Sequence, residues 1–149
     1  MTGKYALSLG LTDEEIGASK YVGLPLDETT LADVLKDNGY TNYIIGKWNL
    51  GNSSPRYLPT ARGFDYHFGY LDGFTSYWSK YDPNFLEEYR DMMYSDSKCY
   101  YQYDSDDIDH YSTHLYQDKA VAVINEHDYD KGPMFLYLSF QAVHGPFKG

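Results

Sequence analysis

The 149-residue chain contains little cysteine, few basic side chains and no long apolar stretch. Its single cysteine, Cys99, excludes a disulfide framework within the chain and leaves the redox compartment open. The chain has 12 Lys and Arg residues against 22 Asp and Glu residues, a formal charge of −10. This balance argues against a nucleic-acid partner, because such binding depends on neutralising phosphates. No apolar run is long enough to span a bilayer, and the sequence after Met1 shows no signal-peptide pattern.

Several common catalytic motifs are absent as well. The sequence has no Walker-type phosphate loop, no dinucleotide-binding glycine pattern and no zinc-ligand spacing. Its Ser and Thr residues lie in no recognisable nucleophile elbow. What the chain does contain is 42% hydrophobic residues, which predicts one globular domain rather than disorder. It also has 18 tyrosines, which could pack in a core or contact sugar rings, since each has an apolar body and a polar tip.

The first expected structural unit is a helix followed directly by a strand. Residues 27–38 predict a helix that Asp27 caps and Gly39 ends. Its apolar stripe would consist of Leu31, Val34 and Leu35. Residues 40–45 then predict a short buried strand, whereas residues 1–24 show no clear period and predict mostly irregular structure.

The second unit repeats this order near the other end of the chain. Residues 112–127 predict a helix with Ser112 or Thr113 as its cap, and residues 134–140 predict another apolar strand. The buried helix face would contain Leu115, Tyr116, Ala120, Val123, Ile124 and His127. Between the two units, residues 71–111 form a long aromatic and acidic insertion without a sustained period. Alternating helices and fully apolar strands indicate an α/β fold with a mainly parallel sheet and helices on both faces.

Each predicted strand is followed by one polar side chain. Lys47 lies just after the first strand in a turn bracketed by Gly46 and Gly51, and His144 follows the second. Open α/β sheets place ligand contacts beyond the carboxyl ends of their strands. A single lysine is most often solvated and a single histidine is more often structural, but together they predict an anion site. An acidic chain needs such a locally positive pocket before it can hold a sulfated or phosphorylated substrate.

Other candidate sites have simpler explanations. Asn52 begins a glycosylation sequon, which matters only in a secretory protein, and a polar turn explains it equally well. Residues 104–109 are rich in Asp, as calcium sites are, yet they lack the Gly and the distal Glu of an EF-hand loop. A solvated acidic loop is the preferred interpretation there. His67 and His110 have no metal-ligand spacing, so surface or packing roles are expected.

Three ordered motifs resemble the sulfatase family. Gly46-Lys-Trp-Asn-Leu-Gly51 is similar to the family segment Gly-Lys-Trp-His-Leu-Gly, and residues 57–65 are similar to its Leu-Pro-Thr-x-Arg-Gly-Phe-Asp stretch. Residues 135–146 resemble the second conserved strand of the family and its sulfate-contacting histidine. The resemblance runs from end to end of the chain. It is closest in character to the arylsulfatase B, or N-acetylgalactosamine-4-sulfatase, type.

This resemblance implies an alkaline-phosphatase-like α/β fold and hydrolysis of sulfate esters, with sulfated glycosaminoglycan sugars as the substrate class. In that family a hydrated formylglycine, made from Cys or Ser, attacks sulfur while a calcium ion and basic residues hold the sulfate. Motif matching implies that Lys47 contacts the sulfate and the formylglycine. It implies that His144 contacts the sulfate or the leaving oxygen. A lysosomal or extracellular location is also implied.

Two departures from the family pattern shape the expectation. Asn49 stands where the family has histidine, and an amide cannot accept a proton near neutral pH as imidazole can. The expected catalytic set is therefore Lys47, Asn49 and His144, with slowed turnover. The second departure is that the formylglycine motif and the calcium ligands would lie upstream of Met1 and beyond Gly149. Chain 1–149 is thus expected to be part of a catalytic domain that is inactive by itself.

Two alternatives stay open at this stage. A catalytically dead protein that binds sulfated glycans would keep Lys47, His144 and the tyrosines. A phosphatase of the same superfamily would use similar chemistry on another ester. A structural expectation also follows, namely that the strands at 40–45 and 134–140 lack neighbours in this chain and leave edges prone to aggregation.

Overall fold

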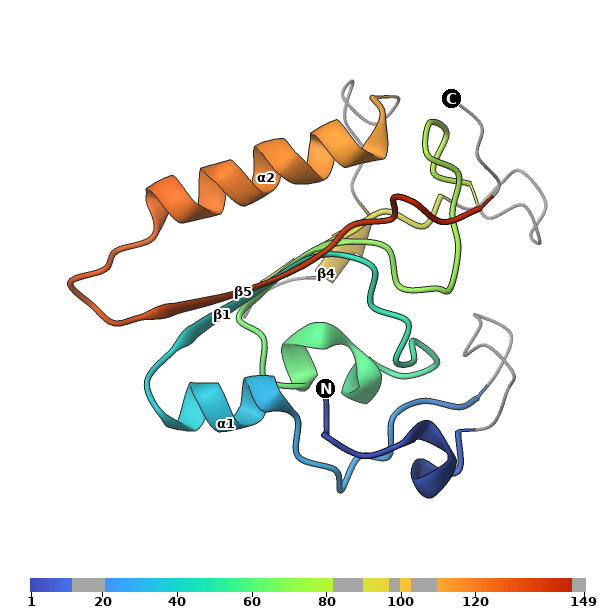
Figure 1. Ribbon diagram of the computed structural model, residues 1–149, viewed down its shortest axis with the longest axis vertical. Coiled ribbons are helices and arrows are strands. Elements are labelled where there is room, and N and C mark those ends of the chain that lie inside the picture. Colours follow the sequence, from blue (N-terminus) through green and yellow to red (C-terminus); the bar gives the residue numbers. More distant parts are fainter. Residues whose placement is uncertain (12–20, 82–89, 97–99, 103–109, 146–149) are drawn as a thin grey trace.

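The computed structural model describes residues 1–11, 21–81, 90–96, 100–102 and 110–145. A five-stranded mixed sheet lies at its centre, in the order β4-β3-β2-β1-β5 (Figure 1). The strands are β1 (Thr41–Gly46), β2 (Tyr66–Gly69), β3 (Met93–Asp96), β4 (Tyr100–Gln102) and β5 (Met134–Ser139). β1 pairs in parallel with both β5 and β2, while β3 and β4 continue the sheet as antiparallel strands.

Helices cover both faces of this sheet, as predicted. The helix α2 (Ser112–Glu126) lies on one face, and α1 (Leu31–Asp37) lies on the other (Figure 1). Two short 3-10 helices, η2 (Pro55–Tyr57) and η3 (Pro59–Ala61), accompany α1, and a third, η1 (Ala6–Leu9), lies near the N-terminus. The α/β expectation, with a mixed sheet between two helical layers, is therefore confirmed.

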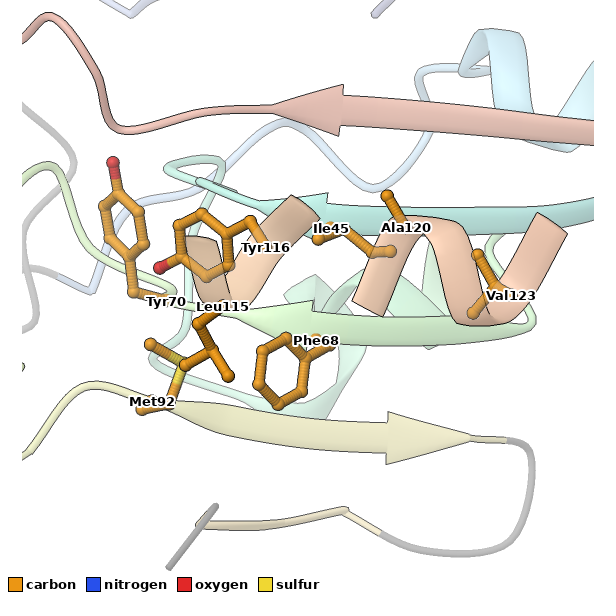
Figure 2. Close-up of a cluster of buried hydrophobic side chains, with 8 residues drawn as sticks. All are labelled: Ile45, Phe68, Tyr70, Met92, Leu115, Tyr116, Ala120 and Val123. Carbon is orange, nitrogen blue, oxygen red and sulfur yellow. The ribbon is translucent and has the colours of Figure 1, made fainter. Parts of the chain in front are cut away.

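The apolar character of β1 follows from its central place between two cores. Successive side chains of a strand point to opposite faces, so the consecutive residues Ile44 and Ile45 enter different clusters. The α2 side contains Ile45, Phe68, Tyr70, Met92, Leu115, Tyr116, Ala120 and Val123 (Figure 2). The α1 side contains Ala32, Ile44, Trp48, Leu58, Phe64, Leu71 and Met93. A strand between two cores has apolar residues on both faces, as β1 has at positions 43–45, and its buried polar residue Asn42 donates to backbone carbonyls instead of to water.

The start of α1 differs from the prediction. The helix begins at Leu31, and its N-cap is Thr30 rather than Asp27. The Thr30 hydroxyl accepts the Asp33 N–H at 3.0 Å, and the Asp33 carboxylate accepts the Thr30 N–H at 2.8 Å. This capping box satisfies two N–H groups that have no partner within the helix, which explains why the helix starts there. The predicted stop holds, because Gly39 follows the helix with φ +83°.

The predicted apolar stripe of α1 is also wrong. Leu31 and Val34 are 48% and 46% exposed, and Ala32 is the residue that packs on the sheet. The Asn42 side chain of β1 donates to the Ala32 carbonyl at 2.7 Å and to the Gly63 carbonyl at 2.8 Å. A small residue at this position allows the helix backbone to come close enough for that bond. Hydrogen bonding to the backbone, rather than the size of the apolar side chains, thus sets how α1 faces the sheet.

Helix α2 matches the predicted range within one residue. Four of the six side chains expected on its inner face are buried, namely Leu115, Tyr116, Ala120 and Val123. Ile124 is exposed, contrary to the prediction, and His127 is partly buried at the C-cap. The predicted side-chain cap is not formed, because Tyr111 occupies the N-cap position. The Ser112 hydroxyl instead donates to Gln141 after β5, at 2.8 Å.

Three short strands were not anticipated from the sequence. β2 lies in a segment left without an assignment, and β3 and β4 lie in the expected irregular insertion at 71–111. Each has only three or four residues, too few to show a period of two. They form because β2 pairs with β1, and β3 and β4 then extend the ladder. Long-range pairing creates these strands.

The expectation that the two predicted strands lack neighbouring strands is wrong for β1, and it is correct for one side of β5. β1 has a partner on each side, whereas β5 is the edge of the sheet formed by the described strands. Exposed apolar side chains lie on or just after this edge, at Tyr137, Leu138 and Phe140. We expect purified chain 1–149 to self-associate through β5, with a mean mass that rises with concentration in sedimentation experiments. A sharp cooperative melt of a monomer would contradict this prediction.

His67 in β2 is completely buried, which confirms the packing interpretation for this residue. Loss of hydration lowers the pKa of His67 to about 3, and the nearby Gly46 backbone opposes the shift only in part. An unfolded histidine titrates near pH 6.5, so the unfolded state takes up a proton that the folded state excludes as pH falls below about 6.5. Stability should therefore decrease between about pH 6.5 and pH 3. At pH 5 the expected loss is about 2 kcal/mol.

Urea unfolding at pH 7 and pH 5 tests this prediction. The variant His67→Leu cannot titrate, and it should lose about 2 kcal/mol less between these two pH values than the unmodified protein does. Comparing the two pH slopes removes the separate effect of repacking the core. Equal slopes for His67→Leu and the unmodified protein would refute the assignment.

Candidate functional site

Three loops meet at the carboxyl ends of β5, β1 and β2. The turn at 47–49, which follows β1, lies between the other two. The Lys47 N–H donates to the Ser139 carbonyl at the end of β5, at 3.0 Å. The Asn49 N–H donates to the Leu71 carbonyl beyond β2, also at 3.0 Å. The Lys47 turn and the loop that leads to His144 therefore follow strands that pair in parallel.

Glycine at position 46 makes this close approach possible. Gly46 has φ +105°, and a Cβ atom there would overlap the carbonyl oxygen of Ser139. Any other residue would push the Lys47 turn away from β5. At the other end of the turn Gly51 has φ +112°, as the bracketing glycines predicted. The backbone of this turn is thus determined by two positions that favour glycine.

Trp48 anchors the turn to the core below it. Its indole N–H lies 3.1 Å from the Gly51 carbonyl and 3.0 Å from the Tyr57 carbonyl, and its ring meets the edge of Phe64 at 6.0 Å. The side chain is buried, so a large apolar surface holds the turn in place. With Trp48 fixed in this way, Lys47 and Asn49 on either side of it remain partly exposed.

Asn49 has a left-handed backbone, with φ 50°. Asparagine, aspartate and histidine enter this region more readily than other side chains, so the conformation suits the residue present. Its Oδ1 atom is buried and has no hydrogen-bond partner among the residues that the structure describes. A buried acceptor without a partner is costly, and such atoms are concentrated at functional sites. Asn49 therefore offers an amide at the edge of the site.

His144 is exposed in the loop that follows β5. Its Nδ1 atom lies 2.7 Å from the Gly145 carbonyl oxygen, which can only accept, so Nδ1 carries the proton. The ring lies 5.7 Å from the ring of Phe74. These contacts orient the imidazole and leave Nε2 as the nitrogen able to exchange a proton with a substrate.

Gln141, which the sequence interpretation did not identify as important, holds the His144 loop in place. Its buried side chain accepts from Ser112 at the start of α2 and donates to the Thr75 carbonyl. The Tyr77 hydroxyl lies 3.1 Å from the Gln141 carbonyl and 2.9 Å from the His144 carbonyl. Partners this far apart in sequence leave no local pattern, so no sequence signal could have revealed this network.

The fit of a metal ion can be tested on the described part of the chain. No group of three or more His, Cys, Asp and Glu side chains there could hold a metal. The Asp-rich residues 104–109 and Cys99 lie outside the described residues. The described residues therefore do not fit a calcium site. No described helix is both long enough and apolar enough to cross a membrane.

Asn52 lies beside the turn and is partly buried. Its amide donates to the Asp72 carboxylate at 2.9 Å, which links the turn to the segment after β2. This bond fits the interpretation as a polar turn. Glycosylation of Asn52 stays a prediction.

The sulfatase family model matches residues 1–149, the complete chain. The chain belongs to the sulfatase family. It is 36% identical over 148 residues to mouse arylsulfatase J, covering 99% of this chain and 24% of that protein. Rat N-acetylgalactosamine-6-sulfatase is 34% identical over 130 residues, covering 83% of this chain and 24% of that protein. This sulfatase chain thus spans about a quarter of the length of these curated relatives.

Solved structures agree with this family assignment. The crystal structure of Ps i-CgsB in complex with k-i-k-neocarrahexaose superposes with a TM-score of 0.80 and 27% identity. The match covers 100% of this sulfatase chain and 34% of that one. The predicted alkaline-phosphatase-like fold is confirmed. The finer resemblance to the arylsulfatase B type stays a prediction.

Proposed function

We propose that the protein carrying this chain hydrolyses sulfate esters, and that the turns bearing Lys47 and His144 form part of its sulfate site. The main support is the hydrogen-bonded junction of the Lys47 turn with the ends of β5 and β2, in a chain that matches the sulfatase family throughout. One cation and one oriented imidazole, on loops that follow two paired strands, suit a substrate with a single anionic group.

The reaction converts a sulfate ester and water into an alcohol and hydrogen sulfate. Lys47 would neutralise charge on the sulfate oxygens as the bond between sulfur and the ester oxygen breaks. His144, when protonated, would give its Nε2 proton to the departing alcohol oxygen. The Asn49 amide would hydrogen-bond at the same edge of the site. This residue cannot act as a base there, so the proposed turnover is slower than with histidine.

The formylglycine and calcium that the family implies would supply the nucleophile and additional charge neutralisation when present. The printed sequence contains no Cys-x-Pro-Ser-Arg motif, and its only cysteine is followed by Tyr-Tyr-Gln-Tyr. We therefore propose that chain 1–149 is inactive by itself and contributes one part of a larger site.

Sulfated sugars are the proposed substrate class, with glycosaminoglycans first among them. The support comes from the relative named N-acetylgalactosamine-6-sulfatase and from the structure of Ps i-CgsB with a neocarrahexaose. A lysosomal or secreted location is proposed on the same family basis. No nucleic-acid partner is proposed, given the charge of −10.

A paired assay on the full-length gene product tests the proposed activity. The sulfate and phosphate esters of one chromogenic phenol differ only in the transferred group, so their rates separate a sulfatase from a phosphatase. We expect release of the phenol from the sulfate ester and much slower release from the phosphate ester. The reverse order would overturn the proposal.

Asn49 favours one second candidate, a protein that binds sulfated glycans without hydrolysing them. The family histidine is absent at this position, while Lys47 and His144 are retained. Binding of a sulfated oligosaccharide by a full-length protein that releases no phenol from the sulfate ester would support this candidate.

A further inference from the structure

A cavity of about 510 Å³ lies beside the start of α2. It is lined by Trp78, His110, Tyr111 and His114, which come from two segments well separated in sequence. Its volume lies in the range of small-ligand pockets, which are mostly apolar with a few convergent polar groups. The described part of the lining combines aromatic faces with imidazole nitrogens.

The aromatic rings of the cavity form an ordered stack. Tyr111 lies parallel to Tyr77 with ring centres 5.4 Å apart, and Trp78 packs against Tyr111 at the same distance. His114 meets Tyr111 edge-on at 5.5 Å. Trp78 is nevertheless 47% exposed, so one large aromatic surface of the stack remains uncovered.

A buried lysine holds the two sides of the cavity together. Lys80 is fully buried, and its ammonium group donates to the carbonyl oxygens of Tyr77, Trp78 and His110 at 2.9, 2.6 and 2.6 Å. Hydrogen bonds from a charged donor are stronger than neutral ones, and burying a charge is costly unless such partners are present. Residues 77–78 and residue 110 are therefore held together by one ammonium group. This part of the cavity wall is in place before any ligand binds.

The same stack reaches the His144 loop. The ring of Tyr77 packs on Tyr111, and its hydroxyl donates to the His144 carbonyl at 2.9 Å. One side chain thus joins the cavity to the turn that carries the proposed proton donor. Trp78 directly follows Tyr77, so its half-exposed ring lies next to the residue that contacts the His144 loop.

We propose that this cavity is a sugar-binding subsite, in which Trp78 stacks on a ring of the oligosaccharide whose sulfate reaches Lys47 and His144. This inference rests on the proposed function. The C–H groups on one face of a sugar ring suit an aromatic surface. The imidazoles of His110 and His114 can hydrogen-bond to hydroxyl, carboxylate or sulfate oxygens at the ring edge. The subsite would select oligosaccharides over small aryl sulfates, which are too short to reach it.

The test compares a long and a short substrate in the full-length protein. The long one is a chondroitin tetrasaccharide sulfated on N-acetylgalactosamine, and the short one is a chromogenic phenyl sulfate. In the variant Trp78→Ala we expect about tenfold weaker binding of the tetrasaccharide by calorimetry and a similar rise in its KM. The kcat and KM for the phenyl sulfate should stay unchanged. The matched control is Tyr21→Ala, which removes an exposed aromatic ring at a different place.

Intrinsic fluorescence gives a second readout. Trp78 is 47% exposed whereas Trp48 is 4% exposed, so a sugar bound in the cavity should shift the Trp78 emission, which is isolated as the difference between the unmodified protein and Trp78→Ala. Tetrasaccharide binding without any change in emission, or unchanged affinity in Trp78→Ala, would overturn the subsite even if the phenyl sulfate is hydrolysed. Weaker tetrasaccharide binding in Trp78→Ala by a protein that hydrolyses neither substrate would support the subsite and overturn the proposed activity.

Discussion

The variant Lys47→Ala is expected to lower kcat/KM for a phenyl sulfate about 100- to 1000-fold in the full-length protein. In the proposed site the sulfate oxygens lie beyond the ends of β1 and β5, where Lys47 is the cation that follows β1. Its position depends on backbone contacts, since its N–H donates to Ser139 and the adjacent Trp48 is anchored in the core. Alanine keeps those backbone contacts and removes the side chain with its charge, so thermal melts are needed beside the assay to separate lost binding from lost folding.

Two further variants make this result specific. Lys131→Ala removes an exposed lysine paired with Asp128 in the loop before β5, so it should change activity little. Lys47→Arg keeps the charge but presents a planar group, so it should recover part of the activity. Thermal melts of all three should agree within a few degrees. A Lys47→Ala protein with normal melting and more than a third of the original kcat/KM would show that this lysine does not bind the sulfate.

The variant Asn49→His is expected to raise kcat at least tenfold. General acid–base groups typically contribute 100- to 10,000-fold, and the amide at this position cannot take up a proton near neutral pH. The backbone should accept the change, because histidine also enters the left-handed region in which Asn49 lies, at φ 50°. The Asn49 N–H bond to Leu71 would be retained.

The pH profile separates this effect from a simple change of shape. With histidine at position 49, kcat should gain a new titration between about pH 5 and pH 8, which the original protein lacks. Asn49→Gln serves as the control, since it keeps an amide and should show neither the increase nor the new limb. A kcat that stays unchanged in Asn49→His would mean that position 49 does not limit turnover.

Much of the architecture followed from local patterns. The apolar residues at 43–45 and 134–138 are enough to identify β1 and β5 as strands. β1 and β5 pair in parallel, so the Lys47 turn and the loop that leads to His144 leave the sheet at the same edge. The two glycines at positions 46 and 51 predicted an unusual backbone around the Lys47 turn, and their positive φ values confirm it.

Local patterns failed where two local choices compete. Asp27 and Thr30 can both cap a helix. The helix starts after Thr30 because Thr30 and Asp33 form reciprocal hydrogen bonds. Leu31 and Val34 suggested an inner face, but the bond from Asn42 to the Ala32 carbonyl turns another side of α1 toward the sheet. Such choices depend on partners that lie outside the segment itself.

The sequence alone therefore determined the family, the order of the main elements and the pair of turns that carry Lys47 and His144. These features depend on contiguous residues, whose periods and motifs survive in the linear order. Only the tertiary structure decided that Gln141 and Tyr77 hold the His144 loop. It also decided that Lys80 joins the two segments that line the aromatic cavity. Those groups meet across 29 to 67 positions of chain, and contacts at such separations arise only when the sheet has assembled.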